Sequence, residues 1–99
     1  MVHIIWEFQV DVSQVAAFEK TYGPQGDWAL LFHNSKDYGG TLLLKDTLVP
    51  GRYFTIDIWH TFSSFEDFKT QYIKTYNDLD RTCEKLVLSE KRIGVFEKI

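Results

Sequence analysis

The segment from Arg52 to Trp59 constrains the fold of this chain most, because it has the pattern of a strand with apolar residues on both faces. Side chains alternate along a strand, so Asp57 and Trp59 share one face while Ile56 lies on the other. A chain this small does not readily cover both faces of its own sheet. We therefore expect a second copy of the chain to supply the missing layer.

The 99 residues predict a single domain, residues 1–99, whose eight Phe, five Tyr and three Trp build a large apolar core. The net charge of -3 leaves no basic stripe, which argues against nucleic acid as a partner. No run approaches the roughly 20 apolar residues of a membrane span, and Met1-Val2-His3 lacks a basic signal start. We expect a cytoplasmic protein with no membrane partner, and the single cysteine, Cys83, in the core.

The first half of the chain predicts a strand followed by a broken helix. The strand is expected from His3 to Val10, where apolar residues occupy both alternating faces. Ser13 is in position to cap a helix that Gly23-Pro24 ends. A second, short helix begins near Asp27 and ends at His33-Asn34-Ser35.

The second half predicts a hairpin, one long helix and a last strand. The hairpin joins Tyr38 to about Thr47 with the Arg52–Trp59 strand through the turn Val49-Pro50-Gly51. Ser63 and Glu66 have capping-box spacing at the helix start. Apolar residues then follow at helical spacing: Phe65, Phe68, Tyr72, Tyr76, Leu79, Cys83 and Leu86. The charged residues between them are expected on a solvated face: Lys69, Lys74, Asp78 and Arg81. The final strand, Leu88 to Phe96, is polar enough for a sheet edge.

This order of elements is the α+β, ferredoxin-like split βαβ arrangement, β-α-β-β-α-β, with a four-stranded antiparallel sheet. Right-handed crossovers place both helical segments on one face of that sheet. The first and third strands are then central, and these are the two strands that are apolar on both sides. The prediction is a homodimer that associates through the open sheet face.

At this point the chain resembles the antibiotic biosynthesis monooxygenase (ABM) family of dimeric α/β-barrel proteins. The resemblance covers nearly the full length and rests on the first segment Ile4-Ile5-Trp6-Glu7-Phe8, the strand Thr55-Ile56-Asp57-Ile58-Trp59, and Ser63, Phe65 and Phe68 after it. Members include cofactor-free oxygenases of phenols or quinols, haem-degrading enzymes and proteins without known activity. The resemblance implies that Trp59 lines a pocket between the sheet and the helices.

The resemblance also bears on cofactors. Haem-degrading members use an Asn on the first strand and a His on the second long helix, whereas this chain has Phe8 nearest the first position and no His in that helix. We therefore expect no cofactor. We also expect no metal, because His3, His33 and His60 form no short ligand pair.

Cofactor-free oxygenation needs an apolar cavity, an orienting hydrogen bond and a base for the substrate. Asp57 and Glu7 are the candidate bases, and their pKa values would rise if they shared one face of the central strands. The alternative is that each carboxylate is locked in an ion pair with Lys45, Arg52 or Arg92. His33, at a predicted helix end, is a further candidate acid or base, or a residue that interacts with the helix dipole.

Aromatic residues are the candidates for holding a small aromatic or hydrophobic ligand, although each is also a plausible core residue. Trp59 and Trp28 are expected to form the pocket walls, with Tyr76 or His33 orienting the substrate. The remaining candidates are Trp6, Tyr72 and Tyr22. By resemblance, the expected activity is cofactor-independent monooxygenation of a small phenol or quinol. The alternative is a non-catalytic dimer that binds a small molecule or has a structural role.

Overall fold

The computed structural model describes residues 1–99 as four strands and several helices, in the predicted order. The strands are β1 (Val2–Gln9), β2 (Tyr38–Lys45), β3 (Arg52–Trp59) and β4 (Ser89–Glu97). The α-helices are α1 (Val15–Tyr22), α2 (Asp27–Phe32), α3 (Phe62–Gln71) and α4 (Ile73–Cys83). Single 3-10 turns precede α1 and follow α4, namely η1 (Val12–Gln14) and η2 (Glu84–Leu86).

The strands form one antiparallel sheet in the order β2-β3-β1-β4, which confirms that the first and third strands are central. β2 and β3 make the predicted hairpin, and Gly51 closes it in a left-handed conformation, φ 79°, that favours glycine. The polar strand β4 lies at an edge, as predicted. No helix has the length and apolar composition needed to cross a membrane.

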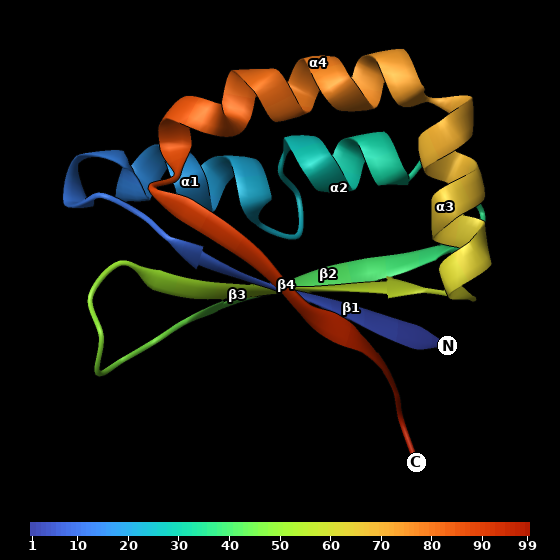
Figure 1. Ribbon diagram of the computed structural model, residues 1–99, viewed down its shortest axis with the longest axis horizontal. Coiled ribbons are helices and arrows are strands. Elements are labelled where there is room, and N and C mark those ends of the chain that lie inside the picture. Colours follow the sequence, from blue (N-terminus) through green and yellow to red (C-terminus); the bar gives the residue numbers. More distant parts are fainter.

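All the helices lie on one side of the sheet, as Figure 1 shows. The alternation of side chains decides which residues they cover. On β3, Tyr53, Thr55 and Trp59 are buried beneath the helices, whereas Ile56 on the other face remains half-exposed. On β1, Ile4 and Phe8 are buried in the same layer. The other face of the sheet is left without a covering element.

Two aromatic clusters fill the layer between helices and sheet. One is built around Trp59, with Phe32, Phe65 and Phe68 among its buried members. The second joins Phe8, Phe18, Tyr22, Tyr53 and Cys83, which confirms that the only cysteine is a core residue. Trp6, Trp28 and Leu79 pack against both clusters and connect them.

The second long helix differs from the prediction, because it is two helices with a break at Tyr72. The backbone leaves the helical region there, at φ -108° and ψ 29°. The apolar spacing continues across the break, which is why the sequence pattern did not show it. The predicted capping box at Ser63 and Glu66 is also wrong by two residues, since Thr61 and Ser64 exchange these bonds at the start of α3.

The caps of the first helices also differ from those predicted. Asp11, not Ser13, caps the first turn: its carboxylate accepts from the Ser13 backbone N–H at 2.9 Å. Asp27 is the first residue of α2 and makes no capping bond, and Gly26 occupies the N-cap position. These shifts move helix starts by one or two residues and leave the buried faces unchanged.

Candidate functional site

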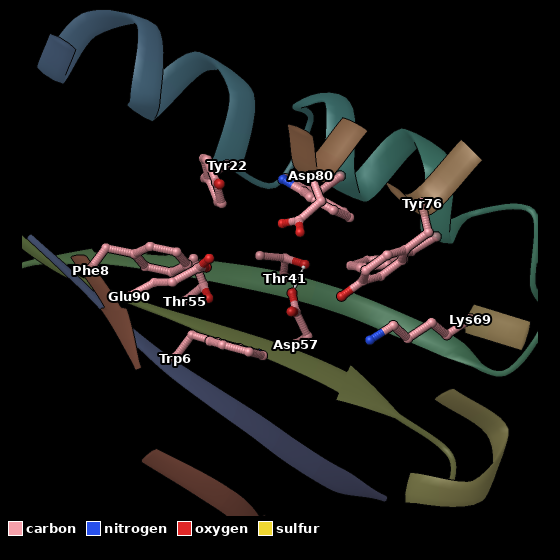
Figure 2. Close-up of a pocket in the computed structure, with 12 residues that line it drawn as sticks. Trp6, Phe8, Tyr22, Thr41, Thr55, Asp57, Lys69, Tyr76, Asp80 and Glu90 are labelled. Carbon is pink, nitrogen blue, oxygen red and sulfur yellow. Dashed lines mark hydrogen bonds between the residues drawn. The ribbon is translucent and has the colours of Figure 1, made fainter. Parts of the chain in front are cut away.

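A cavity of about 150 Å³ lies between the helices and the sheet, with its lining residues drawn in Figure 2. Every strand and every α-helix contributes to it. The strands provide Trp6, Phe8, Thr41, Thr55, Asp57 and Glu90, and the helices provide Tyr22, Trp28, Phe32, Lys69, Tyr76 and Asp80. The cavity therefore combines aromatic walls with six threonine or charged residues, four from the sheet and two from α3 and α4, which are unusual in an apolar core.

Asp57 is the central polar group of this cavity. It stands opposite Thr41 on β2 and Ile4 on β1, so its carboxylate points toward the helices. The Thr41 hydroxyl donates to Asp57 Oδ1 at 2.7 Å, and Thr41 is itself hydrogen-bonded to the Tyr38 hydroxyl. Because a hydroxyl has a single proton, Tyr38 is the donor to Thr41 in this chain of bonds.

Burial raises the pKa of Asp57 to about 6, and the hydrogen bond from Thr41 opposes that rise only in part. The carboxylate takes part in none of the ion pairs of the protein. A carboxylate with this pKa is ionised at neutral pH and holds a proton more strongly than an exposed Asp does. Asp57 thus has the properties of a general base.

Tyr76 and Lys69 lie on the helix side, facing Asp57 across the cavity (Figure 2). The Lys69 ammonium sits 4.7 Å from the centre of the Tyr76 ring, in cation–π geometry. The pKa of Tyr76 is raised to about 12, first by burial and then by the nearby charges of Asp80, Asp57 and Glu90. Its hydroxyl is therefore a hydrogen-bond donor at neutral pH.

Trp28 forms an aromatic wall on the α2 side of the cavity. Its ring packs edge-on against Tyr76, with the centroids 5.0 Å apart, and tilted against Phe32 at 5.8 Å. The indole Nε1 is buried, and its polar neighbours are the Tyr22 hydroxyl and the Cys83 thiol. Trp28 therefore contributes its aromatic ring to the cavity.

Four of the candidate residues from the sequence meet in this cavity: Asp57, Trp28, Trp6 and Tyr76. Tyr22, a further candidate, also lines it. One expectation about the environment of a side chain was wrong. Lys69 lines the cavity, although it was expected on a solvated face, because α3 turns that side toward β3.

Glu7 does not share the face of Asp57. It pairs with Phe54 in the β1–β3 register, on the open side of the sheet, and its carboxylate accepts from Arg52 Nε at 2.6 Å. Arg52 also binds Asp46 at 3.0 Å. The ion-pair alternative is therefore the one observed for Glu7, while Asp57 has no such pair.

Trp59 does not line the cavity, because it is fully buried within the aromatic cluster on the α3 side. Its ring centroid lies 5.4 Å from those of Phe32, Tyr38 and Phe68. The wall role expected for this residue falls to Trp28 and Trp6. The position of Trp59 at the end of β3 brings it under α3 rather than under the gap between α2 and α4.

Tyr72 and His33 also lie outside the cavity. Tyr72, at the helix break, stacks on Phe68 at 4.7 Å and borders a separate polar groove next to His60. His33 is exposed at the C-terminus of α2 and contacts the edge of the Tyr38 ring at 4.9 Å. No group of three His, Cys, Asp or Glu side chains lies close enough to hold a metal ion.

The sequence reasoning missed several lining residues. Thr55 could have been found, since it lies two residues before Asp57 on the same strand and so on the same face. Thr41 required the register of the hairpin. Asp80 and Glu90 gave no signal, because an acid on a helix or an edge strand is typical of an exposed surface.

Comparison with solved structures finds the same fold in several proteins. A variant of SnoaB, a cofactor-independent oxygenase from Streptomyces nogalater, matches with a TM-score of 0.65 at 17% identity, covering 98% of this chain and 91% of that one. PA3566 from Pseudomonas aeruginosa matches with a TM-score of 0.69 at 13% identity, over 99% and 93% of the two chains. A Deinococcus radiodurans protein, provisionally described as an antibiotic biosynthesis monooxygenase, matches with a TM-score of 0.56 at 16% identity, over 99% and 92%.

No family model and no curated protein matches the sequence itself. At these identities the structural likeness speaks for the fold alone. The predicted resemblance to antibiotic biosynthesis monooxygenases is therefore confirmed at the level of the fold, including the split βαβ topology and the four-stranded sheet.

Proposed function

We propose that this chain, which shares the fold of a cofactor-independent oxygenase, is itself a cofactor-independent monooxygenase acting on a small aromatic phenol or quinol. The observation that carries the proposal is Asp57: a buried carboxylate with a pKa of about 6, outside any ion pair, in an aromatic cavity. Such a group costs stability, and a fold retains it where it is useful as a base.

In the proposed reaction Asp57 accepts the proton of a substrate hydroxyl. The resulting phenolate transfers an electron to molecular oxygen, and the two radicals combine to form a C–O bond at a ring carbon. Asp57 returns its proton to the peroxide. Loss of the ring hydrogen as a proton and cleavage of the O–O bond then release water and leave a quinone carbonyl. One oxygen atom stays in the product, and the substrate provides all four electrons.

The protein residues around Asp57 fit this sequence of steps. The Tyr76 hydroxyl is a donor for a substrate oxygen, and the Lys69 ammonium favours the negatively charged phenolate over the phenol. A cavity of about 150 Å³ has the size to hold a single benzene ring. The substrate proposed is therefore a one-ring compound.

The proposed assembly is a homodimer that buries the open sheet face. Leu42 and Leu44 on β2 are 50% and 49% exposed in the isolated chain, and Ile56 and Phe54 lie beside them on β3. An apolar surface of this kind favours association with a second copy. Sedimentation velocity of the wild type and of Leu42→Arg tests it: the variant should sediment as a monomer.

The experiment that tests the activity is oxygen uptake by the purified protein with one-ring phenols and quinols, in parallel with thermal shift. Uptake that depends on the protein and is lost in Asp57→Asn supports the monooxygenase. A thermal shift without uptake favours the non-catalytic binder, for which the small, preformed cavity is sufficient. If none of the ligands binds, a structural role would be the remaining explanation.

A further inference from the structure

We propose that the cavity selects a phenol that carries a positively charged amine. This inference rests on the proposed function, because it defines the substrate of the same site. It follows from the distribution of charge around the cavity, from the position of Asp57 and from the aromatic walls.

Acidic groups outnumber basic ones in the lining. Asp57, Asp80 and Glu90 come from three different elements, whereas Lys69 is the single ammonium. None of the three carboxylates forms an ion pair. Even with Asp57 protonated, two carboxylates face one ammonium. Arg92 is also near Tyr76, but its guanidinium lies over the Phe62 ring at 5.4 Å and does not line the cavity.

The charges are separated along the cavity, as Figure 2 shows. Lys69 lies on the Tyr76 side, while Glu90 lies beside Phe8, its partner in the β1–β4 register, on the far side. Asp80 and Glu84 repel Glu90, and this repulsion adds to burial in raising the pKa of Glu90. A bound cation at this end would relieve that repulsion, whereas an anion would increase it.

The aromatic walls favour the same class of ligand. Trp6, Trp28 and Tyr76 line the cavity, and aromatic rings attract cations electrostatically. The Lys69 ammonium over the Tyr76 ring is one example of this interaction. These aromatic walls suit an organic cation, and the carboxylates form no group that could hold a metal ion.

The base and the acidic end of the cavity place two requirements on the ligand. Asp57 needs a hydroxyl proton to accept, and the Lys69 ammonium on the Tyr76 side favours a phenolate oxygen there. A phenol with an alkylammonium substituent meets both demands. Its oxygen lies at Asp57, toward Lys69, and its ammonium lies toward Asp80 and Glu90.

Three probes with the same ring test the inference: tyramine, 4-ethylphenol and 3-(4-hydroxyphenyl)propionate carry a positive, a neutral and a negative side chain. Their dissociation constants are measured by calorimetry without oxygen, so that turnover does not contribute. We expect tyramine to bind at least about tenfold more tightly than 4-ethylphenol, and the propionate to bind weakest. Equal affinities, a preference for the propionate, or no binding of any probe would overturn the inference.

Two variants and one control locate the effect. Glu90→Gln and Asp80→Asn should each weaken tyramine binding about three- to tenfold and leave 4-ethylphenol unchanged. Both residues are exposed to solvent over part of their surface, which favours correct folding of the variants. Glu66→Gln makes the same charge change on the solvent side of α3 and should not alter tyramine binding. An equal loss in Glu66→Gln would mean that net charge alone attracts the amine and would contradict the inference.

Oxygen uptake with the same probes separates this inference from the proposed function. Selective tyramine binding without oxygen uptake supports the charge preference and refutes the monooxygenase. Oxidation of tyramine and 4-ethylphenol with the same kcat/KM supports the monooxygenase and refutes the charge preference.

Discussion

The two faces of the sheet hold their carboxylates in opposite ways. On the open face, Glu7 is held by Arg52, which also binds Asp46, and all three side chains reach solvent. On the helix-covered face, Asp57 has one hydrogen bond from a neutral hydroxyl and no ion pair. A charge that is paired at a surface is chemically inert, whereas a charge that is buried with a single neutral partner keeps its affinity for a proton. The covered face is therefore where chemistry is expected, and the open face is where a partner is expected.

The largest effect should come from truncating the core of the covered face. Trp59→Ala should lower the free energy of unfolding by about 3–5 kcal/mol, because it opens a cavity among rings that do not collapse into it. Chemical denaturation measures this change. Ile56→Ala on the open face is the comparison: its cost should depend on protein concentration if that face is a dimer interface. An equal decrease in the free energy of unfolding for both variants at every protein concentration would contradict the distinction between the two faces.

The next effect concerns activity. Asp57→Asn should lower oxygen uptake by at least about 100-fold, because the amide cannot accept the substrate proton. In the wild type, kcat/KM should rise as the pH increases through about 6, where Asp57 loses its proton. Glu7→Gln removes a carboxylate from the other face and serves as the matched control. A loss of activity in Glu7→Gln equal to that in Asp57→Asn would show that position relative to the sheet does not decide the role.

The free energy of unfolding should change with pH in the opposite direction to the activity, because both depend on the proton of Asp57. The pKa of Asp57 is raised from 3.8 to about 6 on folding, so the folded state binds the proton more tightly than the unfolded state does. The resulting stability is fully present below pH 3.8 and is lost as the pH rises through about 6. Asp57→Asn, which stays neutral, should equal the wild type at low pH and exceed it above neutrality by up to about 3 kcal/mol.

Urea denaturation of the wild type and of Asp57→Asn at several pH values measures this difference. Thr41→Val is a useful companion variant, because it removes the hydrogen bond that favours the ionised form and should push the pKa of Asp57 further up. A stability difference that does not change with pH would show that Asp57 titrates as an ordinary surface carboxylate.

The smallest effect is expected on the open face. Glu7→Gln should lower the melting temperature only slightly, because its ion pair with Arg52 is partly solvated. The difference should shrink at about 1 M salt, where exposed charges are screened. Thermal melts at low and high salt measure it. A decrease as large as that of Trp59→Ala would place Glu7 in a buried network, contrary to its exposure.

Much of this architecture is predictable because it depends on alternation. The apolar residues of β1 and β3 identify the central strands, and the order of elements then fixes the topology. The parity of each position is also in the sequence: Trp6 and Phe8 lie on one face of β1, so Glu7 must lie on the other. Alternation does not show which side of β1 and which side of β3 lie on the same face of the sheet. That pairing decides whether Glu7 and Asp57 share a face.

The candidate site was less predictable because several of its residues follow no pattern. Lys69 and Asp80 lie on helices whose charged residues normally face solvent, and only the placement of α3 and α4 brings them to the cavity. The sequence pattern around Trp59 is the same for a residue of the cavity wall and for a residue of the core. Its role depends on where α3 begins, and the capping bonds at Thr61 determine the start of α3.

The break at Tyr72 gives the roof of the cavity two separate supports. α3 follows directly from β3 through the cap at Thr61, and α4 runs through η2 into β4. Lys69 is therefore connected to the strand that holds Asp57, whereas Tyr76 and Asp80 are connected to the edge strand that holds Glu90. The polar groups of the roof are thus anchored at two different strands of the sheet, one central and one at the edge.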